Sequence, residues 1–336
     1  MLPALLIAIV VATWLFCHLY RKIALHFHFY DHPNERSVHT EPTPTGAGIV
    51  IVIGFYLGLT IGWQQQLIAT SILTASLGGL PVAAIGLIDD RKKLHWSLRA
   101  VIHMLAAVWC IYYVGFPTLM IMGSTLDPGV VGLVFGVVAL VWLLNLHNFM
   151  DGIDGIAASE IVFVCGAASV LSGFHSEGWG FVNLLLMTVS LGFLIINWPK
   201  AKLFMGDVGS GFLGLTLGML ILAHNEISVW SWMILLSYFV TDACLTILLR
   251  LAHRENITES HSQHAYQHLT RVMGDVKTLY LVILINMLWI FPIAILSARF
   301  PEYGVLLLLL ASLPLLLAEF VCGAGQDQPR LNCLKV

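Results

Sequence analysis

Eleven long apolar stretches are the feature that most restricts how this chain can fold. A membrane-spanning helix needs roughly 20 apolar residues, within a range of about 17–25. Only 10% of the residues are charged and 58% are hydrophobic, whereas ordinary globular domains carry about 25% charged residues. We therefore predict an all-α, polytopic integral membrane protein with about eleven transmembrane helices. The predicted spans are residues 2–20, 46–63, 67–88, 98–116, 129–147, 156–173, 179–197, 208–224, 229–249, 277–297 and 303–321.

Basic residues predict how these spans are oriented. No basic residue precedes the first span, and Arg21 and Lys22 follow it, which is the reverse of a cleavable secretion signal. If residue 1 lies outside, 15 of the 16 Lys and Arg residues fall in or at the edge of inward segments, and only Arg299 faces out. These segments are residues 21–45, 89–97, 148–155, 198–207, 250–276 and 322–336. We expect one transmembrane domain over residues 1–321, an outside N-terminus, and a short cytoplasmic tail over residues 322–336.

The stretch from Asn145 to Gly155, NLHNFMDGIDG, interrupts the apolar pattern with several polar groups. A carboxylate at the centre of a bilayer costs about 2.5–3.5 kcal/mol on insertion scales, so Asp151 and Asp154 should lie where a helix meets water. At three-residue spacing, Asn145, Asn148 and both aspartates share one side if the backbone stays helical. A polar connector is the alternative, but four such groups in register favour a binding site.

Asp89 and Asp90 end another apolar stretch, with Arg91, Lys92 and Lys93 directly after them. Adjacent carboxylates repel each other, and a nearby cation or a proton relieves that repulsion. In a soluble protein this would be a solvated charge run. At the end of a membrane helix, we interpret it as functional.

Asp207 is followed by Val-Gly-Ser-Gly and a new apolar stretch. The N–H groups at a helix start favour anions, so an acidic residue there would repel a phosphate unless a divalent cation lay between them. Mg²⁺ typically takes one or two carboxylates together with phosphate oxygens and water. Asp207 is therefore the best metal-ligand candidate, followed by Asp151 or Asn148, and simple helix capping is the alternative.

The longest inward segment, residues 250–276, contains His261, His264 and His268 at helical spacing, with Arg254 among its basic residues. Three histidines could bind zinc, but no cysteine or well-placed carboxylate completes that set. Histidines and arginines also bind a diphosphate, which we favour over zinc. A solvated loop is the third interpretation.

Together these segments predict one site at the cytoplasmic surface for Mg²⁺, a water-soluble diphosphate and a lipid partner. Phosphoryl transfer needs mainly positioning and charge neutralisation from a protein. The net charge is −3, and no run of basic residues indicates a nucleic-acid partner.

Four motifs in order, GLIDDRKK, NLHNFMDGIDG, FMGDVGSGFLG and HSQHAYQ, closely resemble those of the polyprenyl-phosphate N-acetylhexosamine-1-phosphate transferases. The resemblance covers about residues 1–321 and includes the topology with eleven spans and the N-terminus outside. It implies Mg²⁺-dependent transfer of a sugar 1-phosphate from a UDP-sugar to undecaprenyl phosphate, with release of UMP. It also implies a multi-pass protein of the bacterial inner membrane, with Mn²⁺ as a substitute for Mg²⁺ and a homodimer as a further expectation.

By position, the resemblance implies that one of the paired aspartates acts as base on the lipid phosphate. It implies that Asp207 binds the metal beside Asn148 and Asp151, that Asp154 and Phe204 line the uracil, and that the loop histidines lie near the diphosphate. The candidate catalytic residues are Asp89, Asp90, Asp151 and Asp207. The candidate metal ligands are Asp207, Asn148 and Asp151, and the candidate substrate-binding residues are Asn148, Asp154, Phe204, Arg254, His261 and His264.

Departures from the family pattern bear on the substrate. Thr45 replaces a usual arginine in the turn Pro42 to Gly48, which puts a phosphate contact from that turn in doubt. The loop also lacks the HHHFE-like string of the peptidoglycan branch. The chain therefore more closely resembles the branch that initiates O-antigen or related surface glycans from UDP-N-acetylglucosamine, UDP-N-acetylfucosamine or UDP-N-acetylquinovosamine. A secondary transporter and a peptidoglycan-branch transferase are the alternatives.

Overall fold

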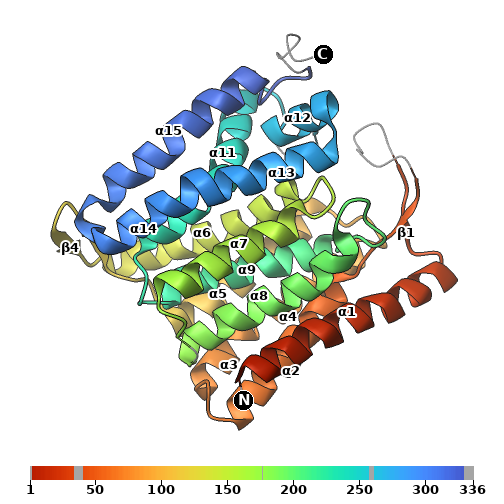
Figure 1. Cartoon of the computed structure of the whole chain (residues 1–336), viewed down its shortest axis with the longest axis horizontal. Coiled ribbons are helices and arrows are strands. Elements are labelled where there is room, and N and C mark those ends of the chain that lie inside the picture. Colours follow the sequence, from red (N-terminus) through yellow and green to blue (C-terminus); the bar gives the residue numbers. More distant parts are fainter. Residues whose placement is uncertain (1, 34–40, 176, 257–260, 329–336) are drawn as a thin grey trace.

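The computed structural model describes residues 2–33, 41–175, 177–256 and 261–328 of the chain. Figure 1 shows a bundle of helices in which each predicted apolar stretch is helical over most of its length. The corresponding helices are α1 (Leu2–His26), α2 (Gly48–Gln64), α3 (Thr70–Ser76) with α4 (Gly79–Asp89), α5 (Trp96–Val114), α6 (Gly129–Met150), α7 (Ile156–Leu171), α8 (Gly178–Asn197), α9 (Asp207–Ala223), α10 (Val229–Leu235) with α11 (Ser237–Ala252), α13 (Asp275–Ile285) with the π-helical turn η1 (Asn286–Ile290) and α14 (Phe291–Arg299), and α15 (Gly304–Cys322). The membrane-protein prediction is thereby supported by the fold.

The remaining elements are short. Helix α12 (Ala265–Met273) lies in the segment between α11 and α13, and the 3-10 turn η2 (Pro301–Tyr303) precedes α15. Two antiparallel strand pairs occur in the described part of the chain. They are β1 (Tyr30–Asp31) with β2 (Thr43–Pro44), and β3 (Leu119–Ile121) with β4 (Ser124–Leu126).

The prediction of eleven spans is confirmed in part. Within the described residues, seven helical segments are long and apolar enough to cross a membrane, and the bent pair α10–α11 can be an eighth. Helices α2, α7 and α9 are apolar but have only 16 or 17 residues, about 25 Å of helix at 1.5 Å per residue. Each begins shortly after a glycine with positive φ, namely Gly46, Gly155 and Gly206, and these turns limit the helix length at one end.

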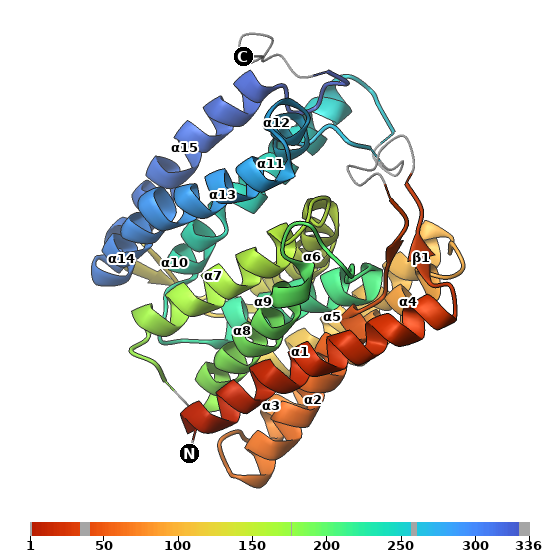
Figure 2. The ribbon, with the colours of Figure 1, turned by 45° about the vertical axis from the view of Figure 1, so that its right-hand side comes forward.

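Helix α9 is the centre of the bundle. Every residue from Val208 to Leu222 is buried, because α2, α4 and α6 all pack against this helix. Its glycines permit the close packing, since a Cβ on Gly209 would meet the backbone of Gly48, and one on Gly214 would meet the backbone of Leu143. Helices α13–α15 lie on one side of α6, α7 and α9, and α1–α4 lie on the other (Figures 1 and 2).

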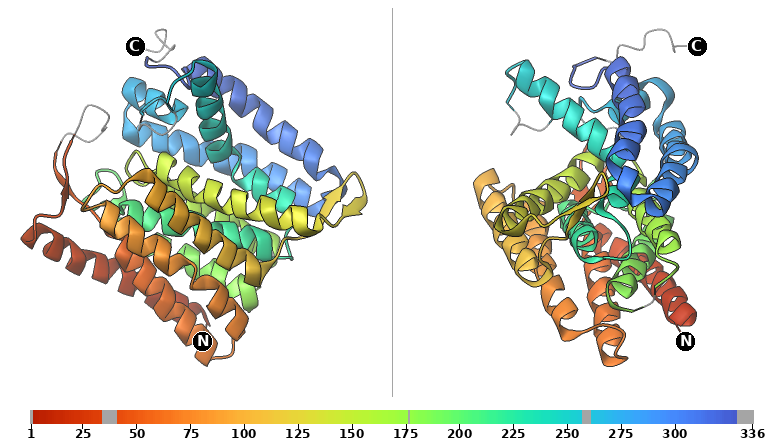
Figure 3. Two further views of the ribbon diagram at one scale, coloured as in Figure 1. Left: turned by 180° about the vertical axis from the view of Figure 1, so that it is seen from behind. Right: turned by 90° about the vertical axis from the view of Figure 1, so that its left-hand side faces the viewer.

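The short elements β1 and α12 lie at one end of the bundle. Helix α1 begins at one end and α15 ends at the other, and β1, α12 and the end of α4 lie at the same end as the end of α15 (Figure 2). Which end faces the cytoplasm stays a prediction. Helix α11 leaves α10 at 74° and projects away from the other helices toward this end (Figure 3).

Candidate active site

The end of α4 and the start of α9 are joined by Asp90. Its carboxylate accepts the N–H of Asp207 at 2.9 Å and that of Val208 at 3.4 Å, so it caps the exposed amides of the α9 N-terminus. Gly206, with φ +72°, permits this approach because an added Cβ would meet the Asp90 carboxylate. A Cβ added to Gly86 of α4 would likewise meet the Asp207 backbone. Two of the predicted motifs are therefore in direct contact.

Asp89 has a different environment from its neighbour. It is 4% exposed, and its carboxylate accepts the Leu94 N–H at 2.6 Å and pairs with Arg99 Nη1 at 2.7 Å. The same Arg99 nitrogen lies 3.3 Å from Asp207. Arg99, in the first turns of α5, therefore bridges two candidate catalytic aspartates. Arg99 was not among the predicted site residues, although a basic residue shortly after a pair of aspartates was a usable signal.

Asn148 brings the third motif to the same place. Its amide donates to Asp207 Oδ1 at 2.8 Å and to Ser210 Oγ at 3.0 Å. Helix α6 ends at Met150, so Asp151 is its C-cap and not a further helical residue. The expected helical backbone therefore ends before Asp151 and Asp154, because Asp151 leaves the helical conformation at φ −87° and ψ 51°, and the four polar residues do not share one helical face. Asn145 instead donates back to Val141 C=O of its own helix.

Asp154 and Asn197 join the loop after α6 to the loop before α9. Asp154 accepts the Ala201 N–H at 2.7 Å. Asn197, 4% exposed, accepts the Gly155 N–H and donates to Leu203 C=O, both at 3.0 Å. Asn197 was not among the predicted residues, although a carboxamide at the end of an apolar stretch marked it.

Phe204 lies against the turn that follows β2. Its N–H donates to Pro44 C=O at 2.8 Å, and its C=O accepts the Ala47 N–H at 3.0 Å. In the next hydrogen bond along the chain, the Gly48 N–H donates to Met205 C=O at 2.8 Å. Backbone hydrogen bonds therefore join the turn that resembles the family's Pro-Thr-Pro sequence to the segment that leads into Asp207.

The clustered carboxylates Asp90 and Asp151 have raised pKa values. Burial and the charge of Asp207 raise the pKa of Asp90 to about 7. Burial, followed by the charges of Asp207, Asp90 and Asp154, raises the pKa of Asp151 to about 7. Like charges at short range disfavour the ionised form, so this group of acids would be stabilised by a bound cation.

The donor set fits Mg²⁺ in chemistry. Asp207 and Asp151 offer carboxylate oxygens, and Asn148 offers a carboxamide. No three His, Cys, Asp or Glu side chains within the described residues converge in a metal-binding arrangement. Mg²⁺ does not need such a set, because it usually takes one or two carboxylates and completes its shell with water and phosphate oxygens.

The histidine segment approaches this cluster through the end of α6. His264, at the start of α12, is 2% exposed, and its ring lies 6.4 Å from the Phe149 ring and 5.0 Å from the His261 ring. The Tyr266 hydroxyl donates to Phe149 C=O at 3.0 Å, and a Cβ on Gly152 would meet that hydroxyl. Predicted residues of the fourth motif therefore lie beside those of the second.

Two other residues of that segment face elsewhere. His268 Nε2 contacts Gln326 C=O at 3.0 Å in the C-terminal tail. Arg254 is exposed beyond the end of α11 and forms no ion pair with the aspartates in the part of the chain that the structure describes. A substrate contact by Arg254 stays a prediction.

Comparisons with known proteins agree with this arrangement. Residues 72–225, which include Asp90, Asn148 and Asp207, match glycosyl transferase family 4. The chain is 26% identical over 303 residues to the undecaprenyl-phosphate alpha-N-acetylglucosaminyl 1-phosphate transferase of Thermotoga maritima, covering 90% of this chain and 92% of that protein. It is 29% identical over 231 residues to the phospho-N-acetylmuramoyl-pentapeptide-transferase of Lactococcus lactis, covering 63% and 68%. It is 30% identical over 226 residues to the decaprenyl-phosphate N-acetylglucosaminephosphotransferase of Mycolicibacterium smegmatis, covering 59% of this chain and 54% of that protein. The resemblance inferred from the motifs is thereby confirmed at the level of the family.

Proposed function

We propose that this chain, whose residues 72–225 match glycosyl transferase family 4, transfers a sugar 1-phosphate from a UDP-N-acetylamino sugar to undecaprenyl phosphate and releases UMP. The sugar is of the N-acetylglucosamine, N-acetylfucosamine or N-acetylquinovosamine type. The product initiates a lipid-linked surface glycan such as O-antigen, and the reaction takes place at the cytoplasmic face of the bacterial inner membrane. The names of the relatives support the polyprenyl-phosphate acceptor and the phospho-sugar donor.

One observation carries this proposal. Asp207, at the N-terminus of the central helix, is in direct contact with Asp90, Arg99 and Asn148 from three other parts of the chain. Such a group places oxygen ligands for a cation beside the guanidinium of Arg99, and both can neutralise phosphate charge. A transferase that joins a nucleotide diphosphate to a lipid phosphate needs this combination, because neutralising and orienting the phosphates is most of its task.

The aspartates then have separate roles. Mg²⁺ held by Asp207, Asn148 and Asp151 would neutralise the diphosphate and its leaving group. Asp90 is suited to accept a proton from the lipid phosphate, because its pKa of about 7 is close to the second pKa of a phosphate monoester, which is about 6. Asp89 is enclosed by Arg99 and the Leu94 N–H, so it orients Arg99 and leaves proton transfer to its neighbour.

The substrate-binding residues surround that centre. Phe204 stacks on the uracil and Asp154 lines its pocket, since both belong to the bonded loops beside Asp207. His261, His264 and Arg254 bind the diphosphate from the α12 side. The lipid tail lies between helices that expose apolar side chains, and the headgroup reaches the aspartates from the bilayer.

A secondary transporter is the second candidate, because carboxylates are also buried inside predicted spans. Glu160 of α7 is 1% exposed and accepts from Asn286 at 2.7 Å, and Glu319 of α15 accepts from Thr241 at 2.7 Å. Buried intramembrane carboxylates are common in substrate and ion pathways. Uptake of a UDP-sugar into vesicles without UMP formation would favour this candidate.

The test uses purified protein, undecaprenyl phosphate and a panel of UDP-sugars, with UMP release as the measurement. We expect release that requires Mg²⁺ or Mn²⁺ and stops with a chelator. Asp207→Asn should reduce turnover by at least about 100-fold, because a metal ligand and its charge are lost, while membrane insertion is unchanged.

The chain supplies a matched control for this variant. Asp275 also follows Met-Gly and precedes Val, begins helix α13 after a positive-φ glycine, and accepts the Val276 N–H at 2.9 Å. Asp275→Asn should therefore keep full turnover. Unchanged turnover in Asp207→Asn would remove Asp207 from the metal role, and absence of UMP release with every donor would refute the proposed reaction.

A further inference from the structure

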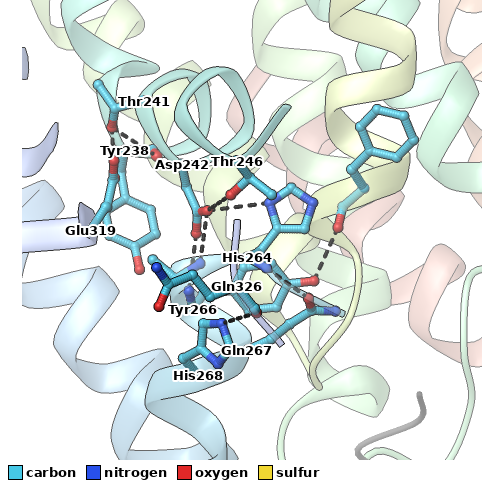
Figure 4. A network of polar contacts seen from close by, with 12 residues as sticks. Tyr238, Thr241, Asp242, Thr246, His264, Tyr266, Gln267, His268, Glu319 and Gln326 are labelled. Atoms are coloured by element: carbon cyan, nitrogen blue, oxygen red, sulfur yellow. Dashed lines mark hydrogen bonds and ion pairs between the residues drawn. The ribbon is translucent and has the colours of Figure 1, made fainter. Parts of the chain in front are cut away.

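Asp242 of α11 is a fully buried carboxylate outside the site described above. It accepts the N–H groups of Ala265 at 2.9 Å and Tyr266 at 3.0 Å, and the Thr246 hydroxyl at 3.2 Å. His264 Nδ1 lies 3.2 Å from the same carboxylate. Figure 4 shows these donors gathered around Asp242 at the start of α12. The carboxylate therefore holds both the helix N-terminus and the imidazole.

Capping alone does not require a charged residue at this position. Serine, threonine or asparagine cap a helix about as well as aspartate, whereas a carboxylate within an apolar stretch is costly to insert into a membrane. What a carboxylate adds is a strong acceptor for a ring N–H. A histidine that donates one ring nitrogen to a carboxylate has its tautomer and orientation fixed.

The consequence concerns the other nitrogen of His264. With Nδ1–H directed at Asp242, Nε2 is left for a ligand, and it has no hydrogen-bond partner within the described residues. The ring is further held by stacking with His261, at 29° between planes, and by the Phe149 ring at 6.4 Å. Phe149 directly follows Asn148, so the fixed imidazole stands beside the proposed metal and diphosphate site.

We propose that Asp242 is a positioning residue, which keeps His264 protonated at Nδ1 so that Nε2 faces the diphosphate. It acts through His264 and does not touch substrate. This inference rests on the proposed function for the ligand of Nε2, while the geometry of the Asp242–His264 pair stands on its own contacts.

Helix α12 has anchors that do not involve Asp242. Gln267 accepts the His264 N–H at 3.1 Å, His268 contacts Gln326 C=O, and the Gly325 N–H donates to Gln263 C=O at 2.9 Å. A change at Asp242 can therefore loosen the imidazole without detaching the helix. This separation makes the proposal testable by substitution.

The activity test is a double-mutant cycle with Asp242→Asn, His264→Gln and the double variant. We expect Asp242→Asn to lower turnover by about 10–100-fold, the range seen when the carboxylate partner of a functional histidine is removed. The double variant should be no slower than His264→Gln alone, because residues that act as a unit are non-additive. Additive losses would mean that Asp242 supports the fold and not His264, which overturns the proposal.

Glu319→Gln is the matched control. It makes the same acid-to-amide change at a neighbouring buried carboxylate, whose contact is Thr241 and not the imidazole (Figure 4). Its turnover should equal that of the unchanged protein. A loss as large as that of Asp242→Asn would show that any buried acid in this region has the same effect, and would contradict a specific role through His264.

A spectroscopic measurement distinguishes failure of this inference from failure of the proposed function. In ¹⁵N-histidine-labelled protein, the signals that disappear in His264→Gln belong to His264. We expect Nδ1 to carry a proton in the unchanged protein, and Asp242→Asn to mix the tautomers. A His264 ring without a proton on Nδ1 would overturn the proposal even if Asp242→Asn did not fold. If no UDP-sugar supports UMP release but Nδ1 is protonated, the proposed reaction fails and the Asp242–His264 pair remains.

Discussion

The raised pKa values of Asp90 and Asp151 predict how stability depends on pH in metal-free protein. Both groups have a pKa of about 7 in the folded chain, against about 3.9 for an unperturbed aspartate. Between these values the folded state keeps protons that the unfolded state has lost. Stability from these groups is therefore fully present below about pH 4 and is lost as the pH rises through about 7.

The size of the effect follows from the shift. Each pKa unit corresponds to 1.36 kcal/mol, so a carboxyl that titrates near 7 loses about 2.5 kcal/mol of stability between pH 5 and pH 8. Asp90 is only partly buried, and water screens part of this effect. We expect about 1–2 kcal/mol from Asp90, or a midpoint temperature lowered by roughly 2–4 °C.

The assay compares thermal unfolding of unchanged protein and Asp90→Asn in detergent, from pH 5 to pH 8. The asparagine Oδ1 can still accept the Asp207 N–H, so the cap of α9 is kept. Histidines also titrate in this range, but they are common to both proteins and cancel in the difference. The variant should therefore gain roughly 2–4 °C over the unchanged protein as the pH rises from 5 to 8.

Adding Mg²⁺ should reverse the trend, because a cation favours the ionised carboxylates. The increase in midpoint temperature caused by Mg²⁺ should be larger at pH 8 than at pH 6. A difference curve that is flat from pH 5 to pH 8 without metal would refute the burial argument for Asp90. Absence of any Mg²⁺ effect at pH 8 would refute the metal site while leaving that argument intact.

Two further substitutions test the contacts around Asp207. Gly206→Ala should lower stability by about 1–3 kcal/mol and strongly reduce turnover, because the added Cβ meets the Asp90 carboxylate at a φ of +72°. Gly274→Ala is the control, because Gly274 has a φ of +85° and nothing lies within 4 Å of the added Cβ. It therefore measures the effect of backbone strain alone. An equal loss of turnover in this variant would contradict the steric explanation. Arg99→Gln should reduce turnover and destabilise the protein by about 1–3 kcal/mol, since it leaves Asp89 buried without its ion pair. Full activity in that variant would show that the bridge to Asp207 is not needed.

Long apolar stretches made the helices predictable. A stretch of about 20 apolar residues in lipid satisfies its backbone best as a helix, and each of the eleven predicted stretches is helical in the structure. Contact between Asp207 and Asn148 could also be anticipated, because one motif lies at a helix end and the other at a helix start on the same predicted side of the membrane. The short lengths of α2, α7 and α9 could not, since glycine conformation at their starts depends on tertiary contacts.

The contacts of individual residues within a motif depend on how each helix is rotated about its axis, which the sequence does not show. Asp89 and Asp90 are adjacent, yet one pairs with Arg99 and the other caps α9, and no sequence pattern separates these environments. Asp242 did give a signal, because an aspartate inside a predicted span is energetically unfavourable without a partner. Its partners at the start of α12 lie more than 20 residues further along the chain, so that pairing needed the fold.

The contact between Gly48 and Gly209 has a consequence for ligand design. Because two backbones touch there and hydrogen bonds join the flanking chain to Phe204 and Met205, the backbone of Phe204 and the acidic helix start are held together before any ligand binds. Little conformational freedom then remains to be lost on association, which favours tight binding by rigid compounds. A flat heterocycle rigidly linked to a chelating group should therefore inhibit better than a flexible analogue with the same groups.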